Sequence, residues 1–172
     1  NHSPAKSNLK QEAAKRGVEP DRIIFAGLLS RPEHLTRVGV ADLFLDTFPY
    51  NAGVTASDAL WAGVPVLTRM GESFASRVAG SVLHAIQLPE LITYCKEEYE
   101  SRAIELATNP TELYEIRKKL RENRLTTPLF DVKLFAKHIE AAYTAMHERC
   151  LAGLPPDHIE ILPQEYQDDK LA

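Results

Sequence analysis

The sequence predicts an α/β protein in which helices flank a parallel sheet, followed by a helical C-terminal part. Strands are expected in the first half of the chain at 23–26, which is continuously apolar, and at 43–46 and 64–68, which are apolar up to a polar last residue. Runs of this kind are typical of strands that are buried on both faces. Connections of about a dozen residues with helical patterns separate them, which is the βαβ arrangement of a parallel sheet.

Each element of the first half has its own local signal. Sparse apolar residues predict an exposed helix from Ala5 to a stop at Gly17, and Pro32 suits the first turn of the next helix. The segment 51–61 is expected to be a loop that turns into a helix stopped by Gly63. A further helix is expected over 71–83, and 84–88 is a candidate fourth strand.

The second half is expected to be helical in three pieces, at about 89–108, 111–124 and 131–150. Thr111 and Asp131 are the expected N-caps of the last two, and Gly153 follows the last. The last helix carries an apolar stripe that is more typical of core packing than of a partner site, formed by Leu134, Phe135, Ile139, Ala142, Tyr143 and Met146.

Length and composition favour one ordinary domain. The chain has 172 residues, a net charge of −4 and a hydrophobic fraction of 44%, which excludes a disordered or fibrous protein. No apolar run reaches the roughly 18 residues that span a bilayer, and no charged-then-apolar segment near Asn1 resembles a signal peptide. The acidity argues against a nucleic-acid partner. We expect a lobe over 1–153, a tail over 154–172 and, because the sequence starts at Asn1 without Met, a longer parent protein.

Cysteines and histidines show no pattern for a metal or a disulfide framework. Cys95 and Cys150 are the two cysteines, and the six histidines lack metal-ligand spacing. This usage indicates a reducing, cytoplasmic location, and we expect neither metal nor cofactor. Phosphate-binding Gly-rich loops and nucleophile elbows are also missing from the sequence.

Three loops are candidates for ligand binding, because ligands of parallel sheets bind beyond the carboxyl ends of the strands. They span 27–34, 47–58 and 69–73 and are expected to meet on one rim. In the second loop, Asn51 to Asp58 place small and hydroxyl residues at a helix start, where backbone N–H groups favour a phosphate. The alternative is that Asn51, Thr55 or Ser57 only caps the helix, and composition alone favours that interpretation.

The first loop combines basic side chains with an imidazole. His34 and Arg37 share a helix face and suit a nucleobase, and Arg31 suits a hydroxyl or a phosphate. The alternative is a solvated basic face beside acidic Glu33. Asp58 suits ribose hydroxyls or, alternatively, the positive end of the helix dipole. For Asp46, at the end of a strand, we expect hydrogen bonds to the following turn.

Several segments together resemble the O-linked N-acetylglucosamine transferase family, including its bacterial tetratricopeptide-repeat members and the plant SPINDLY-type relatives. These segments are Arg22–Phe25, Glu33-His34, Ala41-Asp42, Leu45–Thr47, Asp58–Pro65, Gly71–Ala79 and Thr127–Asp131. The resemblance covers about residues 10 to 160. It implies a GT-B architecture with two Rossmann-like lobes, of which this chain is the C-terminal lobe, incomplete at its N-terminus.

The resemblance also implies roles for the residues of the rim. The backbone at Leu29 meets the uracil, His34 stacks on it, Arg31 and Asp58 bind ribose, and Arg37 supports the uridine pocket. The diphosphate and sugar are held by Asn51, Gly53, Val54 and Thr55. Better-known members have Asn-Gly-His-Thr-Thr where this chain has Asn51-Ala52-Gly53-Val54-Thr55, so an imidazole and a hydroxyl are missing.

The implied function is to bind a UDP-sugar, UDP-N-acetylglucosamine, for an inverting glycosyltransferase that modifies Ser and Thr of acceptor proteins. The parent adds an N-terminal catalytic lobe and tetratricopeptide repeats. SPINDLY-type relatives use GDP-fucose, which leaves the base open. The family's phosphate-binding Lys and its catalytic His lie upstream, so no catalytic residue falls in this chain and it is expected to be inactive alone. The alternative is a non-catalytic binding or interaction module of the same fold.

Overall fold

The computed structural model describes residues 3–162, and the chain divides into two compact units, Asn1–His34 and Leu35–Ala172. The last part of the expected tail, 163–172, lies outside the described residues. None of the described helices is both long and apolar enough to cross a membrane.

The N-terminal unit contains α1 (Ser3–Lys15), a 3-10 turn η1 (Pro20–Arg22) and the start of α2 (Arg31–Val38). Gly17 follows α1 with a positive φ of 75°, as its role as a helix stop predicts. The strand expected over 23–26 is wrong: these residues form no strand, and Ile24 is 87% exposed. An apolar run becomes a buried strand only where neighbouring strands pair with it, and none of the three strands of the described sheet pairs with this run.

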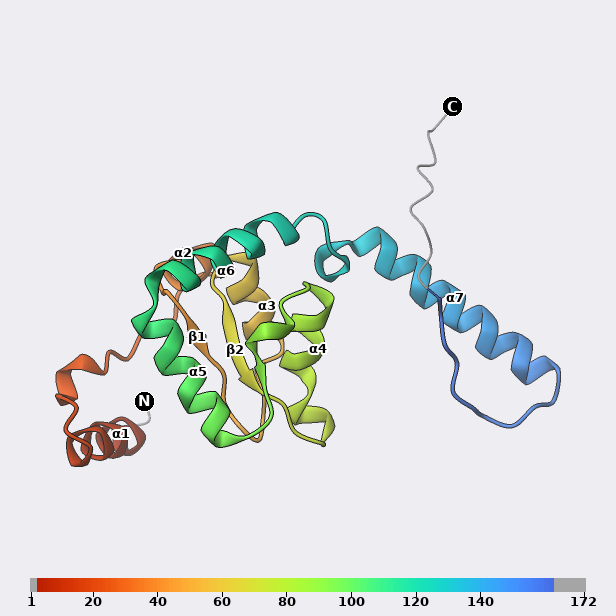
Figure 1. The fold of residues 1–172 in the computed structure, drawn as a ribbon. Coiled ribbons are helices and arrows are strands. Elements are labelled where there is room, and N and C mark those ends of the chain that lie inside the picture. The colour runs from red at the N-terminus through yellow and green to blue at the C-terminus, as the bar shows by residue number, and fades with distance from the viewer. Residues whose placement is uncertain (1–2, 163–172) are drawn as a thin grey trace. The chain divides into compact units, whose positions relative to one another are not determined.

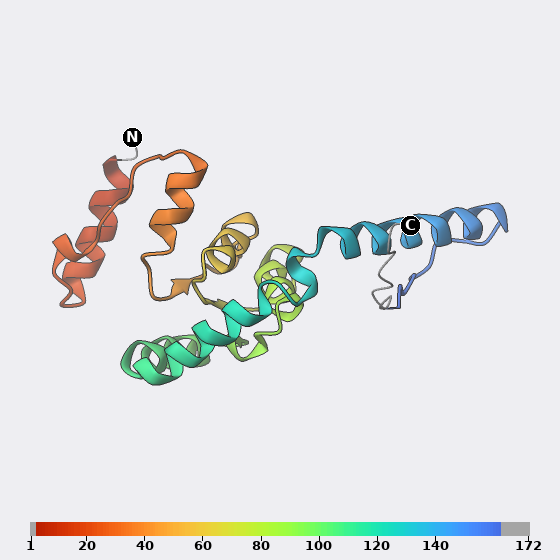
Figure 2. The ribbon, with the colours of Figure 1, turned by 90° about the horizontal axis from the view of Figure 1, so that it is seen from above.

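The second unit is built on a parallel sheet of three short strands in the order β1-β2-β3, namely β1 (Phe44–Leu45), β2 (Val66–Arg69) and β3 (Ile92–Thr93). Phe44 pairs with Val66, and Thr68 pairs with Ile92. In Figures 1 and 2, α3 (Val54–Trp61) and α4 (Val78–Ala85) cover one face, and α5 (Lys96–Thr108) covers the other. The expected α/β class with flanking helices is therefore confirmed.

The expected fourth strand over 84–88 is also wrong. Helix α4 continues to Ala85, Gln87 turns the chain with a φ of 58°, and a 3-10 turn η3 (Pro89–Leu91) leads into β3. Ile86 and Leu88 are fully buried, so the apolar residues of this turn pack into the hydrophobic core. The helix expected from residue 71 begins later, after a 3-10 turn η2 (Phe74–Ser76).

The C-terminal part is helical, as expected, with α5, α6 (Pro110–Asn123), a 3-10 turn η4 (Pro128–Phe130) and α7 (Val132–Leu151). Asp131 caps α7 by accepting the amide of Leu134. The cap expected at Thr111 is wrong, because Asn109 caps α6 and Pro110 takes its first position. The backbone N–H of a first-turn residue has no partner within the helix. Proline, which lacks this N–H, therefore takes the first position without the loss of a hydrogen bond.

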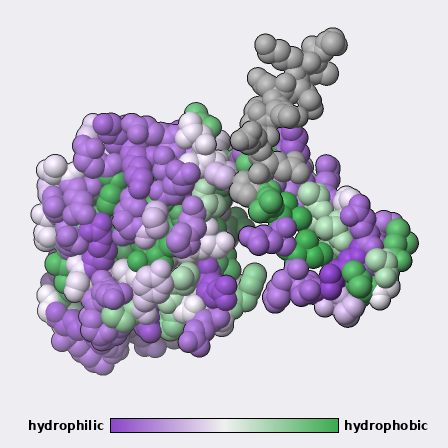
Figure 3. Space-filling view, turned by 45° about the vertical axis from the view of Figure 1, so that its right-hand side comes forward, coloured by the Kyte–Doolittle hydropathy of each residue, from purple (hydrophilic) through white to green (hydrophobic). Residues whose placement is uncertain are grey.

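The hydrophobic core lies between the sheet and helices α3 to α6. Its fully buried members include Leu60, Val66, Leu83, Leu106 and Leu120. Helix α7 buries no residue, which contradicts the core packing expected for its apolar stripe. Phe135 and Tyr143 are more than 60% exposed, and Figure 3 shows apolar surface, in green, on the α7 part of the molecule.

Candidate functional site

Two of the three expected ligand loops lie at the carboxyl edge of the parallel sheet. One leaves β1 after Leu45 and enters α3 at Gly53, and the other leaves β2 after Arg69 and leads through η2 to α4. The third expected loop, 27–34, follows no strand and belongs to the N-terminal unit.

The buried carboxylate of Asp46 braces the loop between β1 and α3. Its Oδ1 accepts the amides of Thr47, at 2.8 Å, and of Ala52, at 2.7 Å. Its Oδ2 accepts the hydroxyl of buried Thr68 at 2.6 Å. The hydroxyl of Tyr99 donates to the Asp46 carbonyl oxygen at 2.8 Å. The expected hydrogen bonds of Asp46 to the following turn are confirmed. The bonds to Thr68 and Tyr99 also link Asp46 to β2 and α5.

Asn51 is the second buried polar residue of this loop. Its side-chain amide donates to the carbonyl oxygens of Thr47, at 2.9 Å, and of Arg69, at 3.3 Å. Its backbone N–H donates to the Ala75 carbonyl oxygen. Its Oδ1 is buried and has no hydrogen-bond partner among the described residues. Leaving such an acceptor unpaired is costly, and the residue lines the hollow described next.

Helix α3 begins at Gly53 without a side-chain cap. The alternative that Asn51, Thr55 or Ser57 caps it is therefore wrong; the Ser57 hydroxyl donates back to the Gly53 carbonyl at 3.4 Å. Val54 and Thr55 are exposed. The helix start borders an open hollow of about 360 Å³, lined by Phe44, Leu45, Asp46, Thr47, Tyr50, Asn51, Ala52, Gly53 and Thr55. An uncapped N-terminus over a hollow is suited to an anion.

The loop after β2 is packed against this site. The Arg69 guanidinium lies over the Phe48 ring, 4.0 Å from its centroid. A Cβ at Gly71 would lie 2.6 Å from the Ser76 hydroxyl and 2.9 Å from the Phe48 ring, so only glycine fits there. Ser73 caps η2 by accepting the Ser76 amide.

The residues expected at the nucleoside fall in both units. Leu29, Arg31 and His34 lie in the N-terminal unit, and Arg37 and Asp58 lie in the second. Their convergence on one pocket stays a prediction. Between Leu29 and His34 in the sequence, Ser30 donates through its backbone N–H and its hydroxyl to the Glu33 carboxylate. These hydrogen bonds hold the pKa of the Glu33 carboxyl below its usual range.

The structure also adds residues to the site that sequence reasoning missed, namely Phe48, Thr68, Arg69 and Tyr99. Thr68 offers a weak sequence signal, because it is the one hydroxyl residue in the otherwise apolar run 64–68. Tyr99 lies 53 positions from Asp46, and nothing local marks their contact. Among residues 3–162, no group of three or more His, Cys, Asp or Glu is arranged to hold a metal ion.

Residues 3–139 match the model of glycosyl transferase family 41. The chain belongs to this family. It is 41% identical to a probable UDP-N-acetylglucosamine–peptide N-acetylglucosaminyltransferase SEC of Arabidopsis thaliana over 156 residues, which are 90% of this chain and 16% of that protein. It is 38% identical to the UDP-N-acetylglucosamine–peptide N-acetylglucosaminyltransferase of Caenorhabditis elegans, over 88% of this chain and 13% of that protein.

A solved structure shares the fold. An O-GlcNAc transferase variant from Thermobaculum terrenum superposes with a TM-score of 0.81 and 31% identity, over 88% of this chain and 29% of that one. The resemblance drawn from the sequence and the GT-B fold class are thereby confirmed. The chain spans about an eighth to a sixth of the length of these two curated relatives.

Proposed function

We propose that this chain is the donor-binding lobe of a family 41 enzyme that transfers N-acetylglucosamine from UDP to Ser and Thr hydroxyls of proteins, with inversion. The observation that carries the proposal is the uncapped start of α3 over a hollow at the carboxyl edge of a parallel sheet. The relatives named as UDP-N-acetylglucosamine–peptide transferases support the choice of donor and acceptor class.

The diphosphate would lie on the first turn of α3. The backbone amides at Val54 and Thr55 and the Thr55 hydroxyl would donate to its oxygens, since the first amides of a helix lack partners within the helix. Asn51, which lines the hollow, would border the sugar. The nucleoside would be held by Leu29, Arg31, His34, Arg37 and Asp58.

The chemistry asked of this lobe is to stabilise the leaving group. In a single displacement, the acceptor oxygen bonds to the anomeric carbon, the carbon–phosphate oxygen bond breaks, and the electron pair stays on the diphosphate. The proton of the acceptor hydroxyl passes to a base outside this chain. The α3 dipole and amides would face the growing charge on the diphosphate, which is electrostatic catalysis. Asp46 would keep those donors fixed before the reaction begins.

Gly53 and Val54, where this chain departs from the family pattern, leave the backbone donors in place. A Cβ at Gly53 would contact only Val78 Cγ1, at an ordinary van der Waals distance of 3.6 Å, so the glycine is not required by space at its Cβ. The departures therefore remove side-chain contacts to the donor and leave the helix start unchanged. We expect them to affect the discrimination between sugars more than the binding of the nucleotide.

An NMR titration of the 172-residue chain with UDP and with GDP tests the proposal. Saturable shifts of the Val54 and Thr55 amides, larger with UDP, are expected. Thr55→Val removes one hydroxyl at constant shape and should weaken UDP binding about fivefold. The matched control is Thr111→Val, because Thr111 holds the same second position in α6, and its effect should be below twofold.

Two results would overturn the proposal. Unmoved amides at the start of α3 with both nucleotides, in a folded chain, would favour the non-catalytic module. Stronger shifts with GDP than with UDP would reject the uridine donor.

A further inference from the structure

A second pocket lies at the opposite edge of the sheet, near the amino ends of β1 and β2. Its volume is about 470 Å³, within the usual range of small-molecule sites. It is formed by α6 together with the turn before β1 and the turn after α3, through Asp42, Ala62, Gly63, Pro110, Leu113, Tyr114, Arg117, Arg121 and Arg124. Nothing in the proposed donor chemistry uses this pocket.

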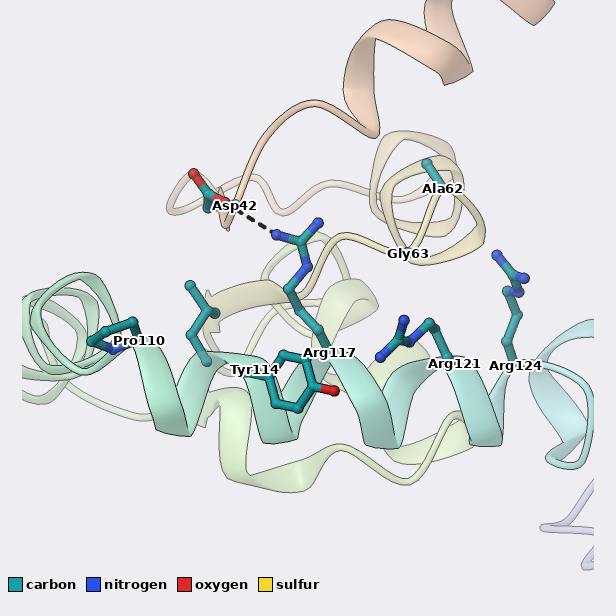
Figure 4. A pocket seen from close by; sticks show the side chains of 9 residues that line it. Asp42, Ala62, Gly63, Pro110, Tyr114, Arg117, Arg121 and Arg124 are labelled. Carbon is teal, nitrogen blue, oxygen red and sulfur yellow. Dashed lines mark hydrogen bonds and ion pairs between the residues drawn. The ribbon is translucent and has the colours of Figure 1, made fainter.

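Three arginines of α6 and the residue after it border the pocket, as Figure 4 shows. Positions 117, 121 and 124 follow the spacing of one helix face. Arg117 donates to the Asp42 carboxylate at 3.1 Å, and the Asp42 side chain is 81% exposed. Such an exposed ion pair is weak and easily exchanged for another anion.

The other two guanidinium groups have no carboxylate partner in the described part of the chain. Arg124 donates to the Trp61 carbonyl oxygen at 2.6 Å and lies over the Trp61 ring, whose edge-to-face contact with Phe130 fixes its position. Arg121 has no hydrogen bond or ion pair with residues 3–162. By contrast, Arg102 on α5 is paired with two glutamates at 2.6 Å, the usual arrangement on the surface of an acidic protein.

The charge and shape of the pocket select the ligand class. Three guanidinium groups and one carboxylate give the pocket a formal charge of +2 in a chain whose net charge is −4. A phosphate monoester carries about −1.5 to −2 at neutral pH and offers oxygens for the planar guanidinium fork. An ionised carboxylate carries only about −1. Leu113 and Tyr114 supply apolar and aromatic surface for the group that the phosphate esterifies.

We propose that this pocket binds a phosphate monoester, with Arg121 and Arg124 holding the phosphate and Arg117 joining them as it leaves Asp42. The ligand is either a small phosphorylated metabolite or a phosphorylated side chain of a protein. Because the pocket lies at the amino edge of the sheet, it can be occupied together with the donor site.

The test is calorimetric titration of the full chain at low salt with phenyl phosphate and, as the carboxylate control, benzoate. Phenyl phosphate should bind at least about tenfold more tightly than benzoate. Arg121→Ala should weaken it about tenfold. Lys118→Ala, an exposed charge on the same helix outside the pocket lining, should change it less than twofold. Asp42→Asn should tighten it by freeing Arg117.

The outcomes separate this pocket from the donor site and the two ligand sources from each other. Thr55→Val should leave the phenyl phosphate affinity unchanged; a loss would mean that the donor site had been measured instead and would overturn the proposal. Equal affinity for benzoate, or equal losses in Lys118→Ala and Arg121→Ala, would also overturn it. Tighter binding of a phosphoserine peptide than of free phosphoserine would identify a protein ligand, and the reverse a metabolite.

Discussion

Replacing Asp46 by alanine is the strongest test of how the candidate site is held together. The carboxylate accepts three hydrogen bonds, from the Thr47 and Ala52 amides and from the Thr68 hydroxyl, at 2.6 to 2.8 Å. Asp46→Ala removes both acceptor oxygens and therefore all three hydrogen bonds at once. Thr47 is exposed and can turn to water, Ala52 is half-buried, and Thr68 is fully buried.

The loss of unfolding free energy in Asp46→Ala depends on whether each of the three donors can form a hydrogen bond to water instead. A buried donor left unpaired costs about 1 to 3 kcal/mol, and a lost bond that water replaces costs about 1 kcal/mol. Two donors of the first kind and one of the second give a loss of about 3 to 7 kcal/mol. That is a large part of the roughly 5 to 15 kcal/mol by which domains are stable. The start of α3 should loosen with it, so UDP binding should fall as well.

The assay is urea unfolding followed by circular dichroism, with Asp131→Ala as the matched control. Asp131 accepts one amide, at the start of a helix that buries nothing, so its loss should cost about 1 kcal/mol. In the double variant with Thr68→Val, the buried hydroxyl is gone and the combined loss should be smaller than the sum. A loss below about 1 kcal/mol for Asp46→Ala would refute the reasoning that this carboxylate braces the loop.

Three further predictions concern the surroundings of the site. Burial, and then a nearby carboxylate, raise the pKa of the Tyr99 phenol. The folded chain therefore holds this proton more tightly, and stability is lost as the pH rises through that pKa; Tyr99→Phe should remove this alkaline loss. Gly71→Ala should cost about 1 to 3 kcal/mol, because its Cβ would lie 2.6 Å from the Ser76 hydroxyl. Leu120→Ala should cost about 2 to 5 kcal/mol, and Phe135→Ser almost nothing.

Each of these predictions has a measurement and a contrary result. Unfolding free energies between pH 8 and about 11 should diverge between wild type and Tyr99→Phe, and parallel curves would contradict the proposed linkage. Gly27→Ala is the control for Gly71→Ala, since a Cβ there meets nothing within 4 Å; equal losses would contradict the steric argument. A melting temperature lowered as much by Phe135→Ser as by Leu120→Ala would mean that α7 packs on the core.

The parts of the fold that the sequence predicts correctly are those fixed by neighbouring residues. Gly17 and Gly63 end their helices with positive φ, and Asp131 caps α7. The runs at 43–46 and 64–68 contain β1 and most of β2 because each is apolar and bounded by turns. The two loops that follow them are correctly placed at the carboxyl edge, since this follows from parallel strands alone.

The errors come from apolar runs whose role depends on distant partners. The run at 23–26 and the run at 84–88 look alike, yet one is largely exposed and the other fills the core as a turn. Their burial depends on which elements pack beside them, and no local pattern carries that information. Tyr99 could not be assigned to the site for the same reason, because it reaches Asp46 only through the packing of α5 on β2.

The start of α3 shows where local and distant information meet. Asn51, Thr55 and Ser57 are all good capping residues, so composition favours a capped helix with no room for a ligand. The structure instead uses Asn51 to bind two carbonyl oxygens and leaves Gly53 at the cap. Asn51 is drawn inward because the Asp46 brace folds the loop over β2. A network of buried side chains therefore keeps the helix start uncapped, and an uncapped start is what an anionic donor requires.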